Sequence, residues 1–393
     1  MSLAGCFHVA GQYVLRHRVR SLLLAVALGL TLALPVVMHG LLRLAEKDLH
    51  SRAQATPLVL GAKGSPLELT LNALYFRLRA IEPIPVRHAQ EIRDSGLAEA
   101  IPLYVRFRAQ EAPIVGTTLA YFDFRHLTLA EGRSMLRLGD CVVGAKVARD
   151  RQLHAGGSIY SSPEQVFDLA GIYPMKLRIT GILADSHSAD DEAIFVDIKT
   201  SWIIQGIGHG HEDLVKAPDS ALLEKQQGNR VANNSVRMFN EVTDANFASF
   251  HFHGDPDDFP LSAMVILPRD AKAQAILLGR YQEGKQGVQL VQPLEEIDAL
   301  LATLFQAEKL ALVVLGALSV LVLLIAGLVF ALSFRLRRKE FVTLEAIGIS
   351  RAAIATVKSL EMLLIGMAAL LVAGLAGGLV QQLGPLLVQM GVR

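Results

Sequence analysis

Two histidine pairs of the form His-x-His have a spacing that could bind a metal ion. They are His209-Gly210-His211 and His251-Phe252-His253, and Asp255 follows the second pair. In an extended chain, residues i and i+2 point to the same face, so each pair could offer two imidazoles to one zinc ion, with Asp255 as a further ligand. Histidines in polar loops also hydrogen-bond to backbone or water without any metal, and spacing alone favours that simpler interpretation. A zinc site at these residues is therefore a hypothesis.

Catalytic and nucleotide-binding patterns are missing from the sequence. We find no grouping of nucleophile, base and acid that would indicate a hydrolase, and no phosphate-binding loop of the form G-x-x-x-x-G-K-[ST]. The stretch Gly61-Ala62-Lys63-Gly64-Ser65-Pro66 lacks that spacing. We therefore expect no catalytic residue, no cofactor-binding residue and no ATP site in this chain.

Three uncharged apolar segments, residues 21–42, 310–334 and 362–380, could cross a membrane and would then position the rest of the chain on its two sides. At about 1.5 Å per residue, each can span a hydrocarbon core about 30 Å thick. A cleaved signal peptide is the alternative for the first segment, but its apolar run is longer than the run of about 7 to 15 residues that signal peptides carry. We expect three transmembrane helices in a multi-pass protein.

The basic residues indicate the orientation. Residues 1–20 carry arginines and no acid, and residues 335–361 carry more basic than acidic side chains. Residues 295–309 instead carry four acidic side chains and a single lysine. Short basic segments are retained in the cytoplasm. We therefore predict an inner-membrane protein with a cytoplasmic N-terminal segment and a periplasmic domain at residues 43–309.

Composition restricts the partners and the covalent links. The formal net charge of +1 implies no nucleic-acid partner, and 52% hydrophobic residues agree with contact to membrane lipid. Only two cysteines occur, and the predicted topology places them on opposite sides of the membrane, so no intramolecular disulfide is expected. Cys6 is expected to be a small buried or interfacial thiol.

Residues 335–361 form a charged, amphipathic segment between two spans. Phe341, Leu344, Ile347 and Ile354 recur at helical spacing beside a charged face, so one side could be buried in a membrane interface or a partner groove. Gly348 could end a helical turn or let a partner backbone approach closely. The simpler alternative is an interfacial helix that only anchors the chain.

The segment between the first two spans is predicted to be an α+β domain. Strands are expected at Ile101–Arg108, Ile114–Thr118, Cys141–Val143, Lys176–Leu183, Ala193–Val196 and Ala263–Leu267, and helices at Pro85–Ser95, Ala145–Gln152 and Pro268–Arg280. Residues 186–260 are rich in Asp, Asn, Gly and His and are interpreted as an insertion of loops around a few ordered pieces.

This order of elements resembles the FtsX-like ABC transporter permeases with a MacB-type periplasmic core domain. The matching residues are Arg338-Lys339-Glu340, Leu344-Glu345-Ala346-Ile347-Gly348, Ser350-Arg351 and Glu361 in the cytoplasmic segment, and Gly132-Arg133, Gly144, Val147-Ala148, Gly156-Gly157 and Ile179-Thr180-Gly181-Ile182 in the outer domain. Such permeases usually have four spans, and residues 381–393 are too short for a fourth, so any role of that helix is in doubt here.

The resemblance implies a function and partners. It implies a permease subunit that works as a homodimer with a separate ABC ATPase subunit, to which ATP binds. The permease would couple ATP hydrolysis by that subunit to motion of the periplasmic domain. The implied coupling residues are Arg338, Glu340, Leu344, Glu345, Gly348, Arg351 and Glu361. A periplasmic or lipoprotein partner is a further possibility. Residues 61–71 and Phe252-His253-Gly254-Asp255 also resemble a subgroup of these permeases associated with zinc homeostasis, so zinc or envelope substrates are conceivable.

Two other classes of function remain open. The chain could be a regulatory membrane module that activates an envelope hydrolase or signals to a sensor, or a membrane-anchored periplasmic metal-binding protein. An anchor alone would not need the arrangement from Glu340 to Glu361, which favours the first two functions over the third.

Overall fold

The computed structural model describes residues 2–78, 81–162, 174–211, 222–226, 229–232, 239–282 and 287–391. The chain divides into two compact units. The helical unit comprises Met1–Leu49 and Ala299–Arg393, and the sheet unit comprises His50–Asp298. The chain passes between the two units within two helices, α2 and α9.

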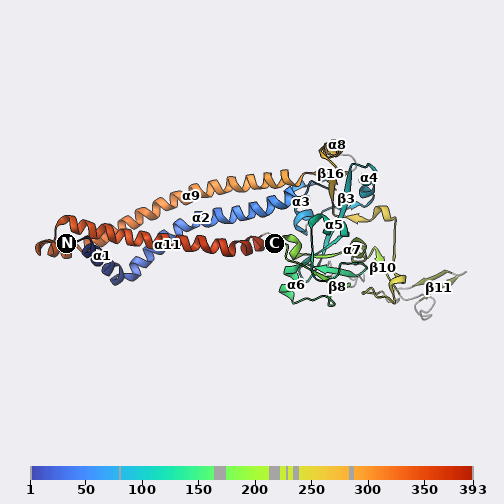
Figure 1. The fold of residues 1–393 in the computed structure, drawn as a ribbon, viewed down its shortest axis with the longest axis horizontal. Helices are drawn as coiled ribbons and strands as arrows, with labels where there is room; N and C mark the ends of the chain where they lie inside the picture. Colours follow the sequence, from blue (N-terminus) through green and yellow to red (C-terminus); the bar gives the residue numbers. More distant parts are fainter. Residues whose placement is uncertain are drawn as a thin grey trace. The chain divides into compact units, whose positions relative to one another are not determined.

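Long helices and two shorter ones make up the described part of the helical unit (Figure 1). They are α1 (Leu3–Arg16), α2 (Arg18–Gln54), α9 (Pro293–Leu336), α10 (Arg338–Ala346) and α11 (Arg351–Gly391). Three of them, α2, α9 and α11, are long and apolar enough to cross a membrane. Each extends beyond the apolar segment predicted from hydropathy, and residues 381–391 of the predicted tail are helical, because a helix ends where its hydrogen bonding stops and not where its apolar run stops.

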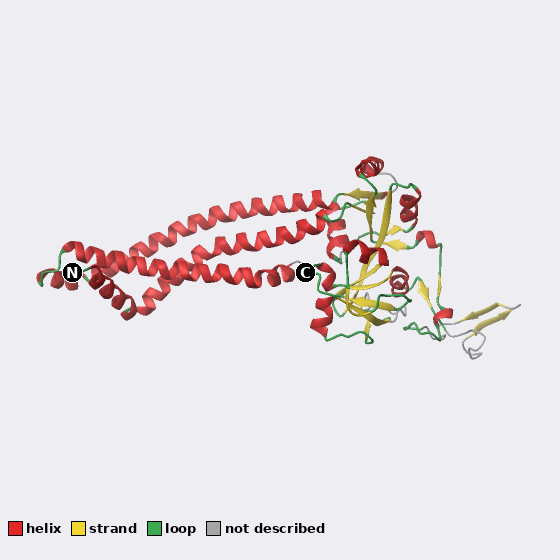
Figure 2. Ribbon diagram, viewed as in Figure 1, coloured by secondary structure: helices red, strands yellow, loops and turns green. Residues whose placement is uncertain are grey.

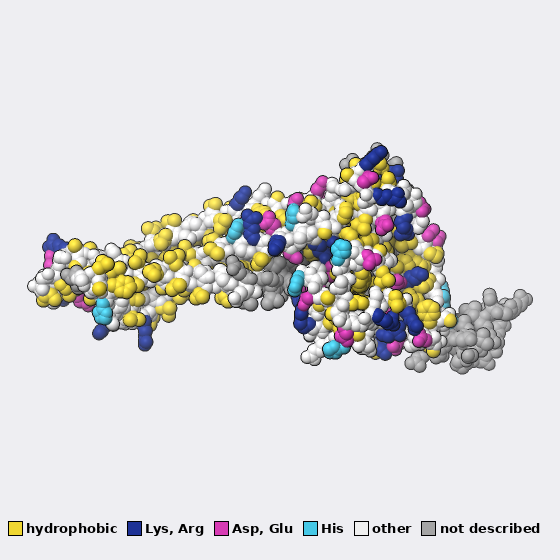
Figure 3. All heavy atoms as spheres, viewed as in Figure 1, with side chains coloured by type: hydrophobic (Ala, Val, Ile, Leu, Met, Phe, Trp, Pro, Cys, Tyr) yellow, Lys and Arg dark blue, Asp and Glu magenta, His cyan; other side chains and the backbone are white. Residues whose placement is uncertain are grey.

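These three helices pack through small and apolar side chains. Ala25 of α2, Phe330 of α9 and Ile365 of α11 form one buried cluster. A Cβ atom on Gly29 would lie 2.6 Å from the Cβ of Val372, so glycine lets α2 approach α11 closely, as small residues do between membrane helices. Most other apolar side chains on these helices are exposed, and they form the yellow surface in Figure 3.

A mixed ten-stranded sheet forms the centre of the sheet unit (Figure 2). Its order is β16 (Val288–Val291), β1 (Leu58–Ala62), β15 (Ala263–Pro268), β3 (Ala98–Ala109), β4 (Ala112–Thr117), β9 (Ile194–Asp197), β6 (Asp140–Val143), β8 (Lys176–Leu183) and β5 (Leu129–Gly132), with β7 (Ser158–Tyr160) beside β8. Neighbouring strands are antiparallel except β4 with β9 and β6 with β8. The long strand β3 pairs with β15 through residues 98–103 and with β4 through residues 104–109, and the pairing with β4 contains a register shift between Val105 and Phe107.

Helices, 3₁₀ turns and two-stranded pairs complete the described part of the sheet unit. The helices are α3 (Pro66–Tyr75), α4 (Arg87–Asp94), α5 (Leu119–Arg125), α6 (Ala145–Arg151), α7 (Ile198–Gln205) and α8 (Ala271–Gln282), with 3₁₀ turns η1 (Ala189–Glu192), η3 (Phe247–Ser249) and η4 (Pro256–Asp258). The two-stranded pairs are β2 (Ile84–Pro85) with β14 (Pro260–Leu261), β10 (Gly208–His209) with β13 (His251–Phe252), and β11 (Leu222–Gln226) with β12 (Asn229–Ala232). The predicted α+β class and all six predicted strands are confirmed, within a few residues at their ends.

The predicted boundary of the loop insertion at residues 186–260 is wrong at its start. The first part of this range contains β9, whose residues Ile194, Phe195 and Val196 are fully buried between β4 and β6, and then α7. The strand itself was predicted at Ala193–Val196, but its place within the central sheet was not, because that place depends on pairing with β4 and β6, which are distant in sequence. Residues 212–221, 227–228 and 233–238 of the predicted insertion lie outside the described residues.

A buried ion pair fixes the last turn of α2 in the sheet unit. The Arg52 guanidinium donates to the two Asp190 oxygens at 2.7 and 3.0 Å and to the Leu74 carbonyl at 2.5 Å. The Tyr121 hydroxyl donates to Asp190 at 2.8 Å. Burial raises the pKa of Tyr121 to about 12, so its hydroxyl keeps its proton for this bond. Burial alone would raise the pKa of Asp190, but the Arg52 charge outweighs it and lowers that pKa to about 2.

The variant Asp190→Asn should lose about 3–5 kcal/mol of unfolding free energy, because it leaves Arg52 buried without a counter-charge. Since the pKa of Asp190 is lower in the folded state, about 2, than in the unfolded state, its ionisation stabilises the fold above about pH 4 and that stabilisation is lost as the pH falls towards 2. Thermal unfolding of the full chain in detergent from pH 2 to 7 measures both effects. The matched control Asp258→Asn removes an exposed partner of Arg87 and should change stability by less than about 1 kcal/mol. Equal effects of the two variants would contradict the assignment.

Candidate functional site

The short helix α10 is set off from its neighbours by defined caps. Arg337 interrupts the helical run between α9 and α10. At the other end the Gly348 amide donates to the Glu345 carbonyl at 3.0 Å, and the Ile349 amide donates to the Leu344 carbonyl at 3.1 Å. This is a Schellman motif, and Gly348 has the positive φ of 95° that it requires. The sequence-based expectation that Gly348 ends a helical turn is confirmed.

A buried carboxylate, Glu361, lies at the centre of this part of the helical unit. Its side chain is fully buried and accepts hydrogen bonds from Arg20 at 2.6 Å and from Arg337 at 2.8 Å. Arg20 also donates to the Ser333 hydroxyl, and Arg337 donates to Glu340 at 3.2 Å. Glu361 therefore connects α2, the α9–α10 break and α11. Two arginines and two glutamates make this cluster, which we call the Glu361 cluster, neutral overall.

Helix α1 covers the Glu361 cluster. The Arg337 guanidinium lies 3.1 Å from the centre of the Tyr13 ring and 4.9 Å from that of Phe341, in cation–π contact with both. Further along α1, Cys6 and Ala10 pack against α11. The buried, unbridged Cys6 confirms the interpretation of this residue as a small buried thiol.

The structure brings most of the predicted coupling residues into two groups. Glu340 and Glu361 share Arg337, whereas Glu345 pairs with Arg351 at 2.5 Å, a pair in which the arginine side chain is 86% exposed. Arg338 is exposed, and Leu344 is half-buried. Of the amphipathic stripe, Phe341 and Ile354 are buried, but Ile347 is 71% exposed.

Arg20, Arg337 and Tyr13 belong to the site although the sequence did not single them out. Arg20 and Arg337 were counted only as basic flanking residues. The signal that could have found them is Glu361 itself, because a carboxylate beside an apolar span needs a buried cationic partner.

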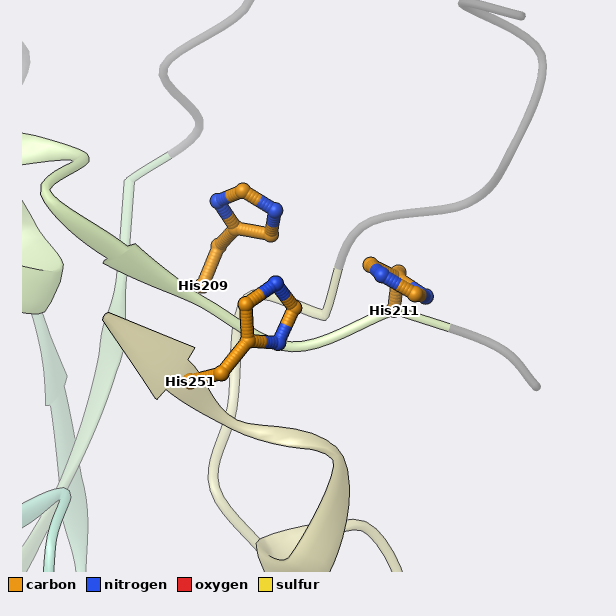
Figure 4. Close-up of side chains that lie close together, drawn as sticks. All are labelled: His209, His211 and His251. Carbon is orange, nitrogen blue, oxygen red and sulfur yellow. The ribbon is translucent and has the colours of Figure 1, made fainter. Parts of the chain in front are cut away.

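The histidines form a second candidate site, in the sheet unit (Figure 4). His209 of β10 lies directly opposite His251 of β13, and their ring centres are 4.8 Å apart. The ring centre of His209 lies 5.8 Å from that of His211 and 4.8 Å from that of His253. Burial and then the neighbouring imidazoles lower the pKa of His209, which favours its neutral form.

Asp255, predicted as a further ligand, has a different local role. Its carboxylate accepts a hydrogen bond from the Asp257 amide at 3.0 Å and caps η4. Among the five predicted metal ligands, those with ligand atoms within 4.8 Å of one another are His209, His211 and His251.

Comparison with solved structures finds weak likenesses. The extracellular domain of the noncanonic ABC-type transporter YknZ from Gram-positive bacteria matches with 12% identity and a TM-score of 0.32, covering 60% of this chain and 98% of that chain. The periplasmic region of MacB from Actinobacillus actinomycetemcomitans matches with 11% identity and a TM-score of 0.34, covering 65% of this chain and 96% of that one. These scores are too low to support an argument about this chain. No curated protein matches it.

The family comparison is more informative. Residues 21–227, more than half of the chain, match the MacB-like periplasmic core domain. The match begins at the apolar part of α2 and includes the strands of the central sheet from β1 to β9, whereas β15 and β16 of that sheet lie beyond its end. The resemblance inferred from the sequence is confirmed, and the chain belongs to the family of the MacB-like periplasmic core domain found in FtsX/MacB-like ABC permeases.

Proposed function

We propose that this chain is the permease subunit of an ABC transporter and that it transmits ATP-driven motion from a separate ATPase subunit to the sheet unit. In this proposal α10 is the cytoplasmic coupling helix, and the sheet unit lies in the periplasm of an inner-membrane protein. The chain acts as a homodimer without an ATP site of its own. A periplasmic or lipoprotein partner would complete the assembly.

The observation that carries the proposal is that α2 is fixed by a buried ion pair near each end. Arg20 binds the buried Glu361 in the helical unit, and Arg52 binds the buried Asp190 in the sheet unit. A force applied at α10 reaches Glu361 through Arg337, and a helix held in this way is suited to carry it to the sheet unit. Helix shifts of this kind are a common basis of switching in proteins.

The exposed surface of α10 and its C-terminal turn is suited to a protein partner. Val342 is 58% exposed and Ile347 is 71% exposed, and Arg338 and Glu345 are exposed beside them. Apolar side chains rimmed by charges are typical of a protein contact. The opposite side, with Phe341, is buried against the helical unit, so a partner bound to this surface would press directly on the Glu361 cluster.

The variant Ile347→Glu should weaken binding of the ATPase subunit by about tenfold or more, because it places a charge in an apolar contact. Co-purification and binding titration in lipid nanodiscs measure the effect. Leu136→Glu is the matched control, since Leu136 is 69% exposed but lies in the sheet unit. Unchanged ATPase binding by the Ile347 variant, or equal loss in both variants, would exclude this surface as the contact.

The variant Glu361→Gln should uncouple ATP hydrolysis from the sheet unit and lower the stability of the chain by about 3–5 kcal/mol, because Arg337 keeps its charge in a buried position. Hydrogen exchange of the sheet unit, with and without ATP in the complex with the ATPase, measures coupling. Glu345→Gln makes the same chemical change in an exposed ion pair, and we expect it to change stability by less than about 1 kcal/mol. An ATP response of the sheet unit that persists in a folded Glu361 variant would exclude the proposed transmission route.

The variant Gly348→Ala should destabilise the turn between α10 and α11 by about 1–2 kcal/mol, through backbone strain at positive φ. A Cβ atom at Gly348 would meet nothing within 4 Å, so no steric clash contributes. Gly366→Ala is the control, since its added Cβ is equally unhindered but lies within α11, where alanine favours the helix. Melting temperatures that shift in opposite directions are the expected result, and a stabilising effect at both positions would contradict it.

A further inference from the structure

We propose that His209, His211 and His251 form a binding site for a divalent transition-metal ion, with Zn²⁺ as the expected ligand. This site belongs to the sheet unit and is separate from the Glu361 cluster. It does not depend on the proposed transport function, because binding needs neither the ATPase nor ATP.

Strand pairing brings the three histidines together. His209 and His251 are cross-strand partners in the antiparallel β10–β13 pair, and the ring of His211 lies 5.2 Å from that of His251. One ligand nitrogen from each of the three residues lies within 4.8 Å of the others. A tetrahedral zinc ion with bonds of about 2.0–2.1 Å to nitrogen needs these atoms somewhat closer, which small side-chain rotations can supply.

The alternation of histidine with glycine or phenylalanine directs these histidines to one face of the β10–β13 pair. A Cβ atom on Gly208 would lie 2.7 Å from the Phe252 ring, and one on Gly210 would lie 2.6 Å from the Phe250 ring. The phenylalanines therefore pack directly against the glycines. Phe252 also continues into an aromatic group with Trp202 and Phe259. Since successive residues of a strand point to opposite faces, the imidazoles gather on the face that the aromatic rings leave uncovered.

A backbone carbonyl prepares His251 for metal binding. Its Nδ1 atom lies 3.0 Å from the Ser249 carbonyl oxygen, and because a carbonyl can only accept, Nδ1 must carry the hydrogen. The proton of a neutral His251 is thereby assigned to Nδ1, and Nε2 retains its lone pair for a metal. Metal-binding histidines commonly have such a bond from the second ring nitrogen, which fixes the tautomer and the ring orientation.

The donor set determines which metals fit. Three imidazole nitrogens suit Zn²⁺ and the neighbouring divalent metals Cu²⁺ and Ni²⁺, whereas Mg²⁺ and Ca²⁺ prefer oxygen ligands. His253 is exposed, and its ring centre lies 4.8 Å from those of both His209 and His251. Its ring nitrogens do not belong to the group of ligand atoms within 4.8 Å of one another, so it would have to move to act as a fourth ligand. Without it, three protein ligands and one open position remain, which is a common arrangement for zinc.

A second group of potential ligands, Asp185, His187 and Asp191, is a poorer candidate. Asp185 pairs with Arg149 at 2.9 Å, and Asp191 accepts a hydrogen bond from the Ser186 amide at 2.9 Å. These carboxylates already have strong partners, so binding a metal would require breaking those bonds.

The test is Zn²⁺ binding to the full chain in detergent, prepared without a polyhistidine tag and stripped of metal with a chelator. Competition with a chromophoric chelator should give one Zn²⁺ per chain for the wild type. The variant His209→Ala/His251→Ala should lose at least about 100-fold in affinity. His154→Ala is the control because its side chain is 78% exposed and it lies outside the cluster, and it should bind as the wild type does.

X-ray absorption at the zinc edge should show imidazole ligation in the wild type, and excess Mg²⁺ or Ca²⁺ should not displace the metal. Stoichiometric binding that persists in the double variant would overturn the proposal, as would weak binding of several ions by the wild type. If the alanine pair fails to fold by circular dichroism, His209→Asn/His251→Asn replaces it and is held to the same criterion.

Discussion

The burial of the Glu361 carboxylate is the constraint on which the arrangement of the helical unit depends. A charge at a fully buried position is stable only with partners of opposite charge, and here Arg20 and Arg337 supply them from α2 and from the start of α10. Apolar packing at Ala25, Phe330 and Ile365 holds the same helices together but is tolerant of sliding. The ion pairs instead select one register of the helices, which is the best-attested role of buried polar groups.

The sheet unit uses the same principle at Arg52 and Asp190. Buried ion pairs add little net stability compared with well-packed apolar residues, yet breaking one is costly. They are therefore well suited to hold the end of a helix in one position. The contrast with Glu345 and Arg351 is instructive, because that pair is exposed to solvent and can exchange partners at little cost.

The local sequence pattern predicted the helices and strands of this protein better than it predicted which strands and side chains pair with one another. The β-branched runs at β3, β8 and β15 indicated strands, and the uncharged segments indicated the long helices. The strand at β9 was predicted, but its central position was not, because its burial arises from pairing with β4 and β6, which are distant in sequence. The pairing of Glu361 with Arg20 was equally invisible, because it depends on which faces of two separate helices meet.

The histidine cluster shows the same limit of sequence-based prediction for the proposed metal site. The i, i+2 spacing correctly indicates two imidazoles on one face of each strand, but it says nothing about whether the two strands pair or in which register. A shift of one residue between β10 and β13 would place His209 opposite Phe252 instead of His251. The packing of Phe250 and Phe252 against Gly210 and Gly208 disfavours that shift. Each ring lies so close to a glycine that a Cβ atom there would collide with it, so the rings fit only opposite residues without a side chain. The glycines and phenylalanines between the histidines are thus as important to the site as the imidazoles themselves.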